Sequence, residues 1–229
     1  MEQNQTRTRL IQFISIFASL ILFYVALWVL HKQIKSSHLV DVLVYLRELP
    51  TQRFLAAFGL ALLSYVALMG YDFLGLRHVG KPMGTGKIAL TSFISYSLSH
   101  NIGMAPVTGG GIRYRLYSAW GLTAGETASV LVICGMTYWV GFLTMGAIFF
   151  FLQPPVLPPS LHIPFNSIFF PGFFCTLVVS AYLLSSVLIK KSIQIAKWKF
   201  PMPGLGIALG QMGVGCLDWT CSALALYLL

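Results

Sequence analysis

The chain has 229 residues, of which 57% are hydrophobic and only 9% are charged. A water-soluble domain carries about 25% charged residues, so this composition excludes a soluble globular protein and indicates an integral membrane protein. The 15 Lys and Arg residues outnumber the 6 Asp and Glu residues, which gives a net charge of +9. In a membrane protein such an excess faces anionic lipid from cytoplasmic loops, so we expect no nucleic-acid partner.

Five apolar runs are long enough to cross a membrane, which takes about 20 residues. They cover Leu10–Leu30, Phe54–Leu76, Ala128–Leu152, Asn166–Ile189 and Pro203–Leu229. The first run is longer than a signal-peptide core and is followed by no small-residue cleavage site, so we expect it to stay in the protein. The mixed residues at 40–49 fit either a helix along the interface or a loop.

The segment 88–103 is short and polar for a helix that faces lipid, and it ends in Gly103 close to Pro106. Its polar side chains that could line a cavity are Ser95, Ser99, His100 and Asn101. A broken helix of this kind is tolerated only where other helices or a wet cavity shelter it, so we predict a re-entrant helix. If this segment turns back, 11 of the 15 Lys and Arg residues lie on the side of the N-terminus, whereas if it spans, 10 of them lie on the opposite side from the N-terminus. The positive-inside rule therefore favours the re-entrant arrangement with a cytoplasmic N-terminus.

These runs predict an all-α polytopic membrane helix bundle with about five spanning helices and one re-entrant helix over residues 88–103. The last run stops at Leu229 with no interfacial residue after it. We therefore expect the chain to be part of a longer protein.

Two acidic residues lie inside apolar runs, where a charge costs about 2.5–3.5 kcal/mol on insertion scales. Asp72 lies five residues before Arg77, near the cytoplasmic end of its predicted helix. It faces a cavity, or it reaches the interface, or it pairs locally with Arg77 or His78. Asp218 lies about 22 Å along the last run, well past the membrane midplane, so we predict a functional role or a buried pair for it.

A glycine-rich stretch, Gly109, Gly110 and Gly111, precedes Arg113 and Arg115. One interpretation is an ordinary positive-inside boundary with aromatic neighbours. The other is a headgroup site, because a glycine-rich loop exposes backbone N–H groups and arginine binds phosphate in a bidentate fashion. We predict that these five residues bind a lipid phosphate.

The sequence shows no catalytic triad, no metal-binding spacing and no nucleotide loop, so we expect no catalytic site, metal or cofactor. The glycine stretch lacks the Lys-Ser/Thr of a P-loop. Glu126 follows Thr123 at capping-box spacing, which favours a structural role. The cysteines lie in apolar runs without a C-x-x-C pair, and we interpret them as packing residues: Cys134, Cys175, Cys216 and Cys221.

Three stretches carry a family resemblance: ISYSLSHNIGMAPVTGGGIRYRLYSAWGLTAGE, YDFLGLRHVGKP and the late LDW. They resemble the transmembrane region of the lysylphosphatidylglycerol synthetase/flippase family, of the multiple peptide resistance factor type. The resemblance covers essentially the whole chain and is most specific at residues 96–126. It implies that residues 1–229 are the N-terminal part of a flippase-like module in the bacterial cytoplasmic membrane. The cytoplasmic transferase domain, which in that family carries phosphatidylglycerol lysyltransferase activity, is absent.

The resemblance implies a function in lipid transport. The module would move lysyl- or alanyl-phosphatidylglycerol from the inner to the outer leaflet, giving resistance to cationic antimicrobial peptides. We expect Arg113 and Arg115 to hold the phosphate, and Asp72 and Asp218 to meet the cationic aminoacyl group. The alternative is a membrane anchor or a homo-oligomeric scaffold for a lipid-modifying aminoacyltransferase. A small-solute transporter is a third class, which would predict an inverted repeat with a second arginine loop.

Overall fold

The computed structural model describes residues 24, 28, 49–102, 105–152, 169–189, 193–195, 198–200 and 202–229. The chain divides into two units, residues 1–51 and 52–229. In the first unit, Tyr24 and Trp28 are helical and residues 49–51 are also described. The predicted first span, Leu10–Leu30, and the segment 40–49 therefore lie almost entirely outside the described residues.

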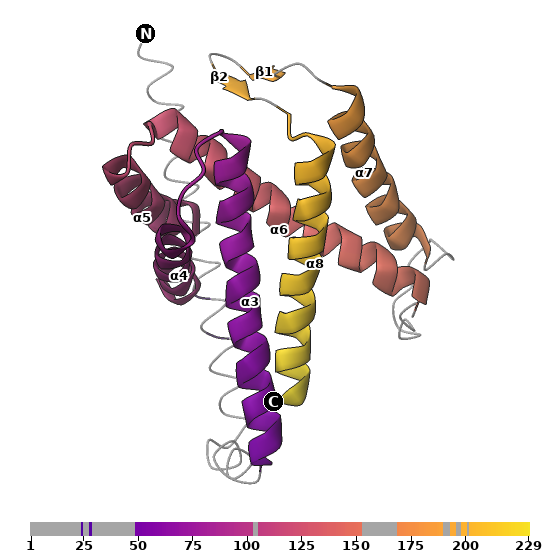
Figure 1. Ribbon diagram of the computed structural model, residues 1–229. Coiled ribbons are helices and arrows are strands. Elements are labelled where there is room, and N and C mark those ends of the chain that lie inside the picture. Colours follow the sequence, from indigo (N-terminus) through magenta and orange to yellow (C-terminus); the bar gives the residue numbers. More distant parts are fainter. Residues whose placement is uncertain are drawn as a thin grey trace. The chain divides into compact units, whose positions relative to one another are not determined.

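The second unit is built from helices (Figure 1). They are α3 (Thr51–His78), α4 (Thr85–Ile102), α5 (Ala105–Ala119), α6 (Ala124–Leu152), α7 (Phe169–Leu188) and α8 (Leu205–Leu228). A small antiparallel hairpin, β1 (Ile193–Ile195) and β2 (Trp198–Phe200), lies between α7 and α8 in the chain. The helices confirm the predicted all-α class. The hairpin was not predicted, because each strand has only three residues in a basic segment that reads as a loop.

Three of the described helices are long and apolar enough to cross a membrane: Thr51–His78, Ala124–Leu152 and Pro171–Leu188. They match three of the predicted spans. The run expected at Pro203–Leu229 is the single helix α8, which is 24 residues long and carries buried Gln211 and Asp218.

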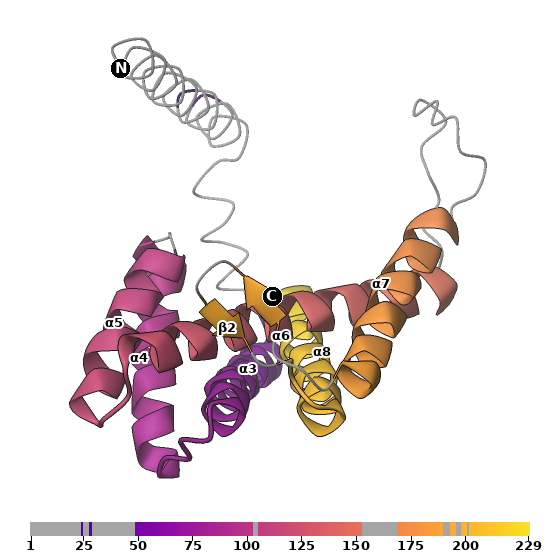
Figure 2. The ribbon, with the colours of Figure 1, turned by 90° about the horizontal axis from the view of Figure 1, so that it is seen from above.

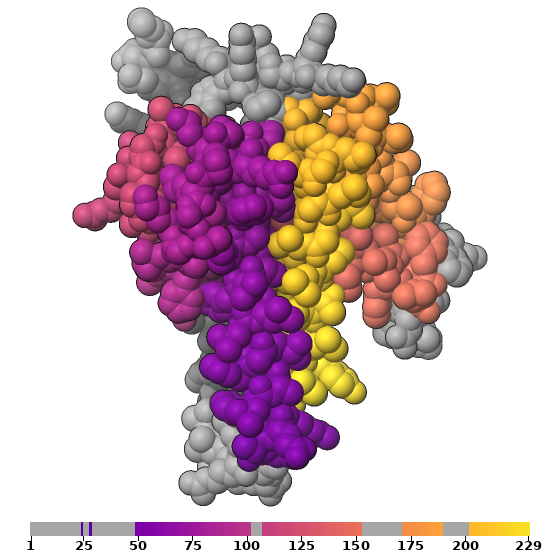
Figure 3. Space-filling view, viewed as in Figure 1, coloured from indigo at the N-terminus to yellow at the C-terminus, as the bar shows by residue number. Residues whose placement is uncertain are grey.

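The outer faces of the long helices carry large apolar side chains. Phe58 and Val66 of α3 are 56% and 61% exposed, and Phe173 of α7 is 61% exposed. Contiguous apolar surface of this kind is what a helix presents to lipid. Figure 3 shows α3 and α8 in contact along one face of the second unit.

The segment 88–103, predicted to be re-entrant, falls mostly in α4, which forms a helical hairpin with α5 in which the two helices pack side by side (Figure 2). Before the hairpin, Lys81 forms an ion pair of 3.7 Å with Glu126 at the start of α6. Lys87, in the first turn of α4, lies 5.2 Å from the ring centroid of Trp120, just after α5. The chain thus enters and leaves the hairpin at the same end, so α4 and α5 together do not carry it across the bundle.

The glycine stretch lies within α5, so the predicted irregular glycine-rich loop is wrong. A Cβ on Gly109 would lie 3.4 Å from the backbone oxygen of Ser95 and would also meet Ser99, both on α4. A Cβ on Gly110 would lie 3.3 Å from Leu131 of α6. These glycines let α5 pack closely against both neighbours, which offsets a helix-propensity cost of about 1 kcal/mol each. Their N–H groups are used by the helix, so they are not free for a phosphate.

Glycine also sets the crossing of α6 and α8. A Cβ on Gly141 would lie 2.5 Å from the backbone of Gly215, and one on Gly215 would lie 2.7 Å from the carbonyl oxygen of Thr137. The two helices therefore cross backbone to backbone, as small residues allow in membrane proteins. On the α3 side, a Cβ on Gly70 would lie 2.8 Å from Val214, so α8 packs closely against both α6 and α3.

Candidate functional site

Asp72 and Arg113 form a buried ion pair where α3 meets the α4–α5 hairpin. Nε and Nη2 of Arg113 donate to the two carboxylate oxygens of Asp72, each at 2.7 Å. Asp72 is 0% exposed and Arg113 is 3% exposed. A bidentate pair of this kind is a strong, geometrically specific form of charge-assisted hydrogen bond. The two charges therefore neutralise each other inside the protein.

Two hydroxyl groups complete the environment of the Asp72 carboxylate. Ser92 of α4 donates at 2.9 Å and Tyr117 of α5 donates at 2.7 Å. The guanidinium of Arg113 also lies 4.4 Å from the ring centroid of Tyr96, within range of a cation–π interaction. The carboxylate thus accepts four hydrogen bonds from two helices, and the pair joins α3 to both arms of the hairpin.

Asp218 of α8 forms a second polar cluster with α3. Ser64 donates to one carboxylate oxygen at 2.5 Å, and the hydroxyl of Tyr71 donates to the other at 2.9 Å. Ser222 lies 3.3 Å from Ser64, oxygen to oxygen. Asp218 is 7% exposed, and within the described part of the chain no Lys or Arg forms an ion pair with it. The hydrogen bonds that this carboxylate accepts from described residues come from hydroxyl groups.

The depth of the Asp218 cluster follows from helix geometry. At 1.5 Å per residue, Asp218 lies roughly 20 Å from the start of α8, and Ser64 lies about the same distance from the end of α3. Helix α3 is long and apolar enough to cross a hydrocarbon core, which is about 30 Å thick, and Ser64 lies near the middle of that helix. An acidic residue at this depth is a functional candidate by default.

The two clusters lie on different sides of α3, although they use adjacent residues. Tyr71 faces Asp218 of α8, whereas Asp72 faces the hairpin. The ring of Tyr71 contacts that of Tyr96 edge-on, with centroids 6.2 Å apart, and Tyr96 in turn lies against Arg113. The structure therefore brings Asp72 and Arg113 together and places Asp218 in a separate site, with aromatic rings between them.

The local alternative for Asp72, an ion pair with Arg77, is wrong because the carboxylate is already paired with Arg113. The structural interpretation of Glu126 is confirmed. The N–H of Thr123 donates to Glu126 at 2.8 Å, and the N–H of Glu126 donates back to the Thr123 hydroxyl at 3.3 Å, as in a capping box.

The remaining predicted phosphate ligands fall on two sides of α5. Gly109 and Gly110 are buried, whereas Gly111 and Arg115 are exposed. Arg115 forms no ion pair within the described residues. Phosphate binding by these residues and by Arg113 stays a prediction.

The predicted cavity residues also separate into two pairs. Ser95 is buried and its hydroxyl has no hydrogen-bond partner within the described ranges, and buried Ser99 donates to the Ser95 carbonyl at 2.6 Å. His100 and Asn101 are exposed, and Asn101 donates to the carbonyl of Ser97 at 2.7 Å. Only the serines therefore lie between α4 and α5.

Sequence reasoning missed the hydroxyl partners of both carboxylates. Helical spacing carries a signal for them. Ser64 and Tyr71 are seven residues apart on α3, and Arg113 and Tyr117 are four apart on α5, so each pair shares one helix face. The spacing of Arg113 and Tyr117 is informative only if α5 is recognised as a helix, and its glycines obscured that. Among the described residues, no group of three His, Cys, Asp or Glu side chains could hold a metal ion.

No protein-family model matches the chain. An uncharacterised protein of Synechocystis sp. is 32% identical over 208 residues, which cover 91% of this chain and 65% of that protein. The inner membrane protein YbhN of Escherichia coli is 26% identical over 191 residues, which cover 82% of this chain and 59% of that protein. The chain thus spans less than two thirds of the length of either relative. The similarity to YbhN and the apolar helices agree in making this chain a helical membrane protein.

Proposed function

We propose that the chain is the membrane part of an inner-membrane protein that moves an aminoacylated phospholipid, such as lysyl-phosphatidylglycerol, between leaflets. The observation that carries the proposal is the Asp218 carboxylate, which is 7% exposed on α8, packs against the candidate span α3 and is faced by hydroxyls rather than by a cation within the described residues. An isolated charge in hydrocarbon is costly, and an opposite charge offsets that cost. The ammonium group of an aminoacyl headgroup supplies it.

The surroundings of Asp218 fit a substrate that arrives from the bilayer. Ser222 lies 3.3 Å from Ser64 and is exposed, so the cluster borders the surface of α8. Nearby apolar side chains on that surface are exposed as well, including Leu224 at 46%. A lipid headgroup that moves from one leaflet to the other meets the carboxylate here, while its acyl chains stay in the hydrocarbon.

The Arg113–Asp72 pair has a different part in this proposal. Its charges are satisfied within the protein, so it fixes the hairpin against α3, and we assign the lipid phosphate to Arg115, which is exposed. The resemblance of residues 96–126 to the lysylphosphatidylglycerol family supports the substrate class. The similarity to the inner membrane protein YbhN supports the location.

A vesicle assay tests the proposal. The full-length protein that contains this chain is reconstituted with lysyl-phosphatidylglycerol, and a membrane-impermeant amine reagent measures how fast inner-leaflet lipid reaches the outer leaflet. Asp218→Asn keeps the size of the side chain and an acceptor for Ser64 or Tyr71 but removes the charge. We expect it to slow translocation about tenfold or more, since a hydrogen bond to a charged group contributes about 1.5–3 kcal/mol. Asp218→Glu should retain part of the rate.

Gly213→Ala is the matched control, because it lies on the same helix and a Cβ there meets nothing within 4 Å. A folded Asp218→Asn protein that translocates at the wild-type rate would overturn the proposal. Wild-type protein that moves no lipid, yet is needed for a synthase to modify it, would instead favour the scaffold function. The buried and internally satisfied Asp72–Arg113 pair is the observation that favours that second function.

A further inference from the structure

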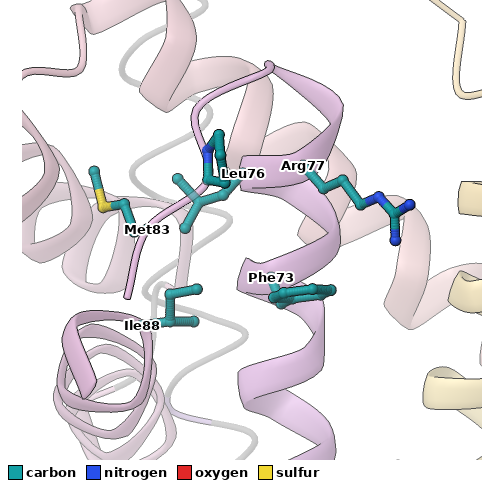
Figure 4. Close-up of a pocket in the computed structure, with 6 residues that line it drawn as sticks. Phe73, Leu76, Arg77, Met83 and Ile88 are labelled. Atoms are coloured by element: carbon teal, nitrogen blue, oxygen red, sulfur yellow. The ribbon is translucent and has the colours of Figure 1, made fainter. Parts of the chain in front are cut away.

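A second site lies at the end of α3, away from both carboxylate clusters. A pocket of about 390 Å³ opens between α3, the segment that follows it and the first turn of α4 (Figure 4). Its lining residues are Phe73, Leu76, Arg77, Pro82, Met83 and Ile88. All but Arg77 are apolar, and the volume is within the range of small-ligand pockets.

Arg77 contributes a cation to the rim of this pocket. Lys81 is paired with Glu126, and Lys87 lies over the ring of Trp120. Arg77 is exposed, and no ion pair holds it within the described part of the chain. In Figure 4 the side chains of Arg77 and Phe73 extend from the same side of α3, away from Met83.

The N-terminal end of α4 adds positive potential to the same pocket. The helix begins at Thr85, and Ile88 of its first turn lines the pocket. The N–H groups of Lys87 and Ile88 donate to the Gly84 carbonyl, and the N-terminal end of a helix carries partial positive charge, which favours an anion nearby. The positive charge and the apolar lining of the pocket together favour a ligand with an apolar chain and an anionic headgroup.

We infer that this pocket binds an anionic phospholipid, with acyl-chain carbons against Phe73, Pro82 and Met83, the apolar lining residues that keep exposed surface, and the phosphate on Arg77. The position of Arg77 in the last turn of a membrane helix sets the height of the headgroup, and Phe73, one turn earlier, faces the chain. The lipid bound in this pocket is separate from the transported lipid. It goes beyond the proposed function and stands even if the protein moves no lipid.

The test measures lipid retained by the purified full-length protein in detergent. Spin-labelled phosphatidylglycerol and phosphatidylcholine are offered separately, and the immobilised fraction is recorded. Arg77→Gln is expected to weaken phosphatidylglycerol binding about tenfold and to leave phosphatidylcholine unchanged, because a charge-assisted contact to phosphate is lost. Arg53→Gln is the matched control, since Arg53 is exposed in the first turn of the same helix. Met83→Trp, which fills the pocket, should also reduce binding.

Equal retention by the Arg77→Gln and Arg53→Gln proteins would overturn the inference, as would full retention by Met83→Trp. Soluble glycerol phosphate that competes as well as the lipid would show a headgroup-only site and would also overturn it. Asp218→Asn should bind phosphatidylglycerol normally at this site. The Arg77→Gln variant therefore tests lipid binding in this pocket, and the Asp218→Asn variant tests translocation.

Discussion

Removing one partner of the Asp72–Arg113 pair should destabilise the protein more than removing both. In Arg113→Met the Asp72 carboxylate, 0% exposed, keeps its two hydroxyl donors but loses both hydrogen bonds from the guanidinium. Leaving one charge of a buried pair without its partner costs about 3–5 kcal/mol. Asp72→Leu leaves the guanidinium unpaired and should cost a similar amount. The double variant buries no charge, so it should lie within about 2 kcal/mol of wild type.

The measurement is a double-mutant cycle on unfolding free energy in detergent micelles, followed by circular dichroism. Arg115→Met is the control for the loss of an arginine on α5, and because Arg115 is exposed it should change stability by no more than about 0.5 kcal/mol. If the unfolding free energies of the single variants lie within about 1 kcal/mol of the wild-type value, the buried ion pair is refuted. A double variant as unstable as the sum of the singles would refute the coupling.

Two further predictions concern helix packing and topology. Gly141→Ala should destabilise by about 1–3 kcal/mol because its Cβ would lie 2.5 Å from the Gly215 backbone. The control is Gly135→Ala on the same helix, where the added Cβ meets nothing within 4 Å, and it should stabilise the protein by up to about 1 kcal/mol. Chemical unfolding measures the stability of both variants. Equal effects would contradict the close crossing of α6 and α8. Cysteines placed at Gly84 and Gly125, on either side of the hairpin, should react with a membrane-impermeant thiol reagent from the same side of sealed vesicles once the native cysteines are replaced by serine. Labelling from opposite sides would contradict a re-entrant hairpin.

Much of the helical architecture could be predicted from the sequence, because the length of an apolar run is set by the thickness of the bilayer. The runs at 54–76 and 128–152 correspond to α3 and α6 with ends a few residues longer. The hairpin was predictable from the shortness and polarity of its first arm. The helical state of Gly109–Gly111 was not, because local propensity favours a loop there and the opposing term is contact with α4 and α6.

The sequence indicates which residues of the candidate site are exceptional, but it does not indicate which of them contact one another. Insertion cost alone marks Asp72 and Asp218 as exceptional. That cost does not say which group meets each carboxylate, since Arg113 lies 41 residues after Asp72 and Ser64 lies 154 residues before Asp218. The sequence-based proposal joined both acids at one headgroup, whereas packing around α3 places them in separate clusters.

The spacing of the Asp72–Arg113 pair has a consequence for how the protein is made. Asp72 is synthesised 41 residues before Arg113, so α3 is made before its partner helix α5. During that interval the carboxylate is without its guanidinium, and its place in the last two turns of α3 keeps it close to the water of the headgroup region. Once α5 is complete, the pair can form and withdraw both charges from water. We expect the hairpin to dock on α3 before the second half of the chain is synthesised, whereas the Ser64–Asp218 contact must wait for α8, the last helix described.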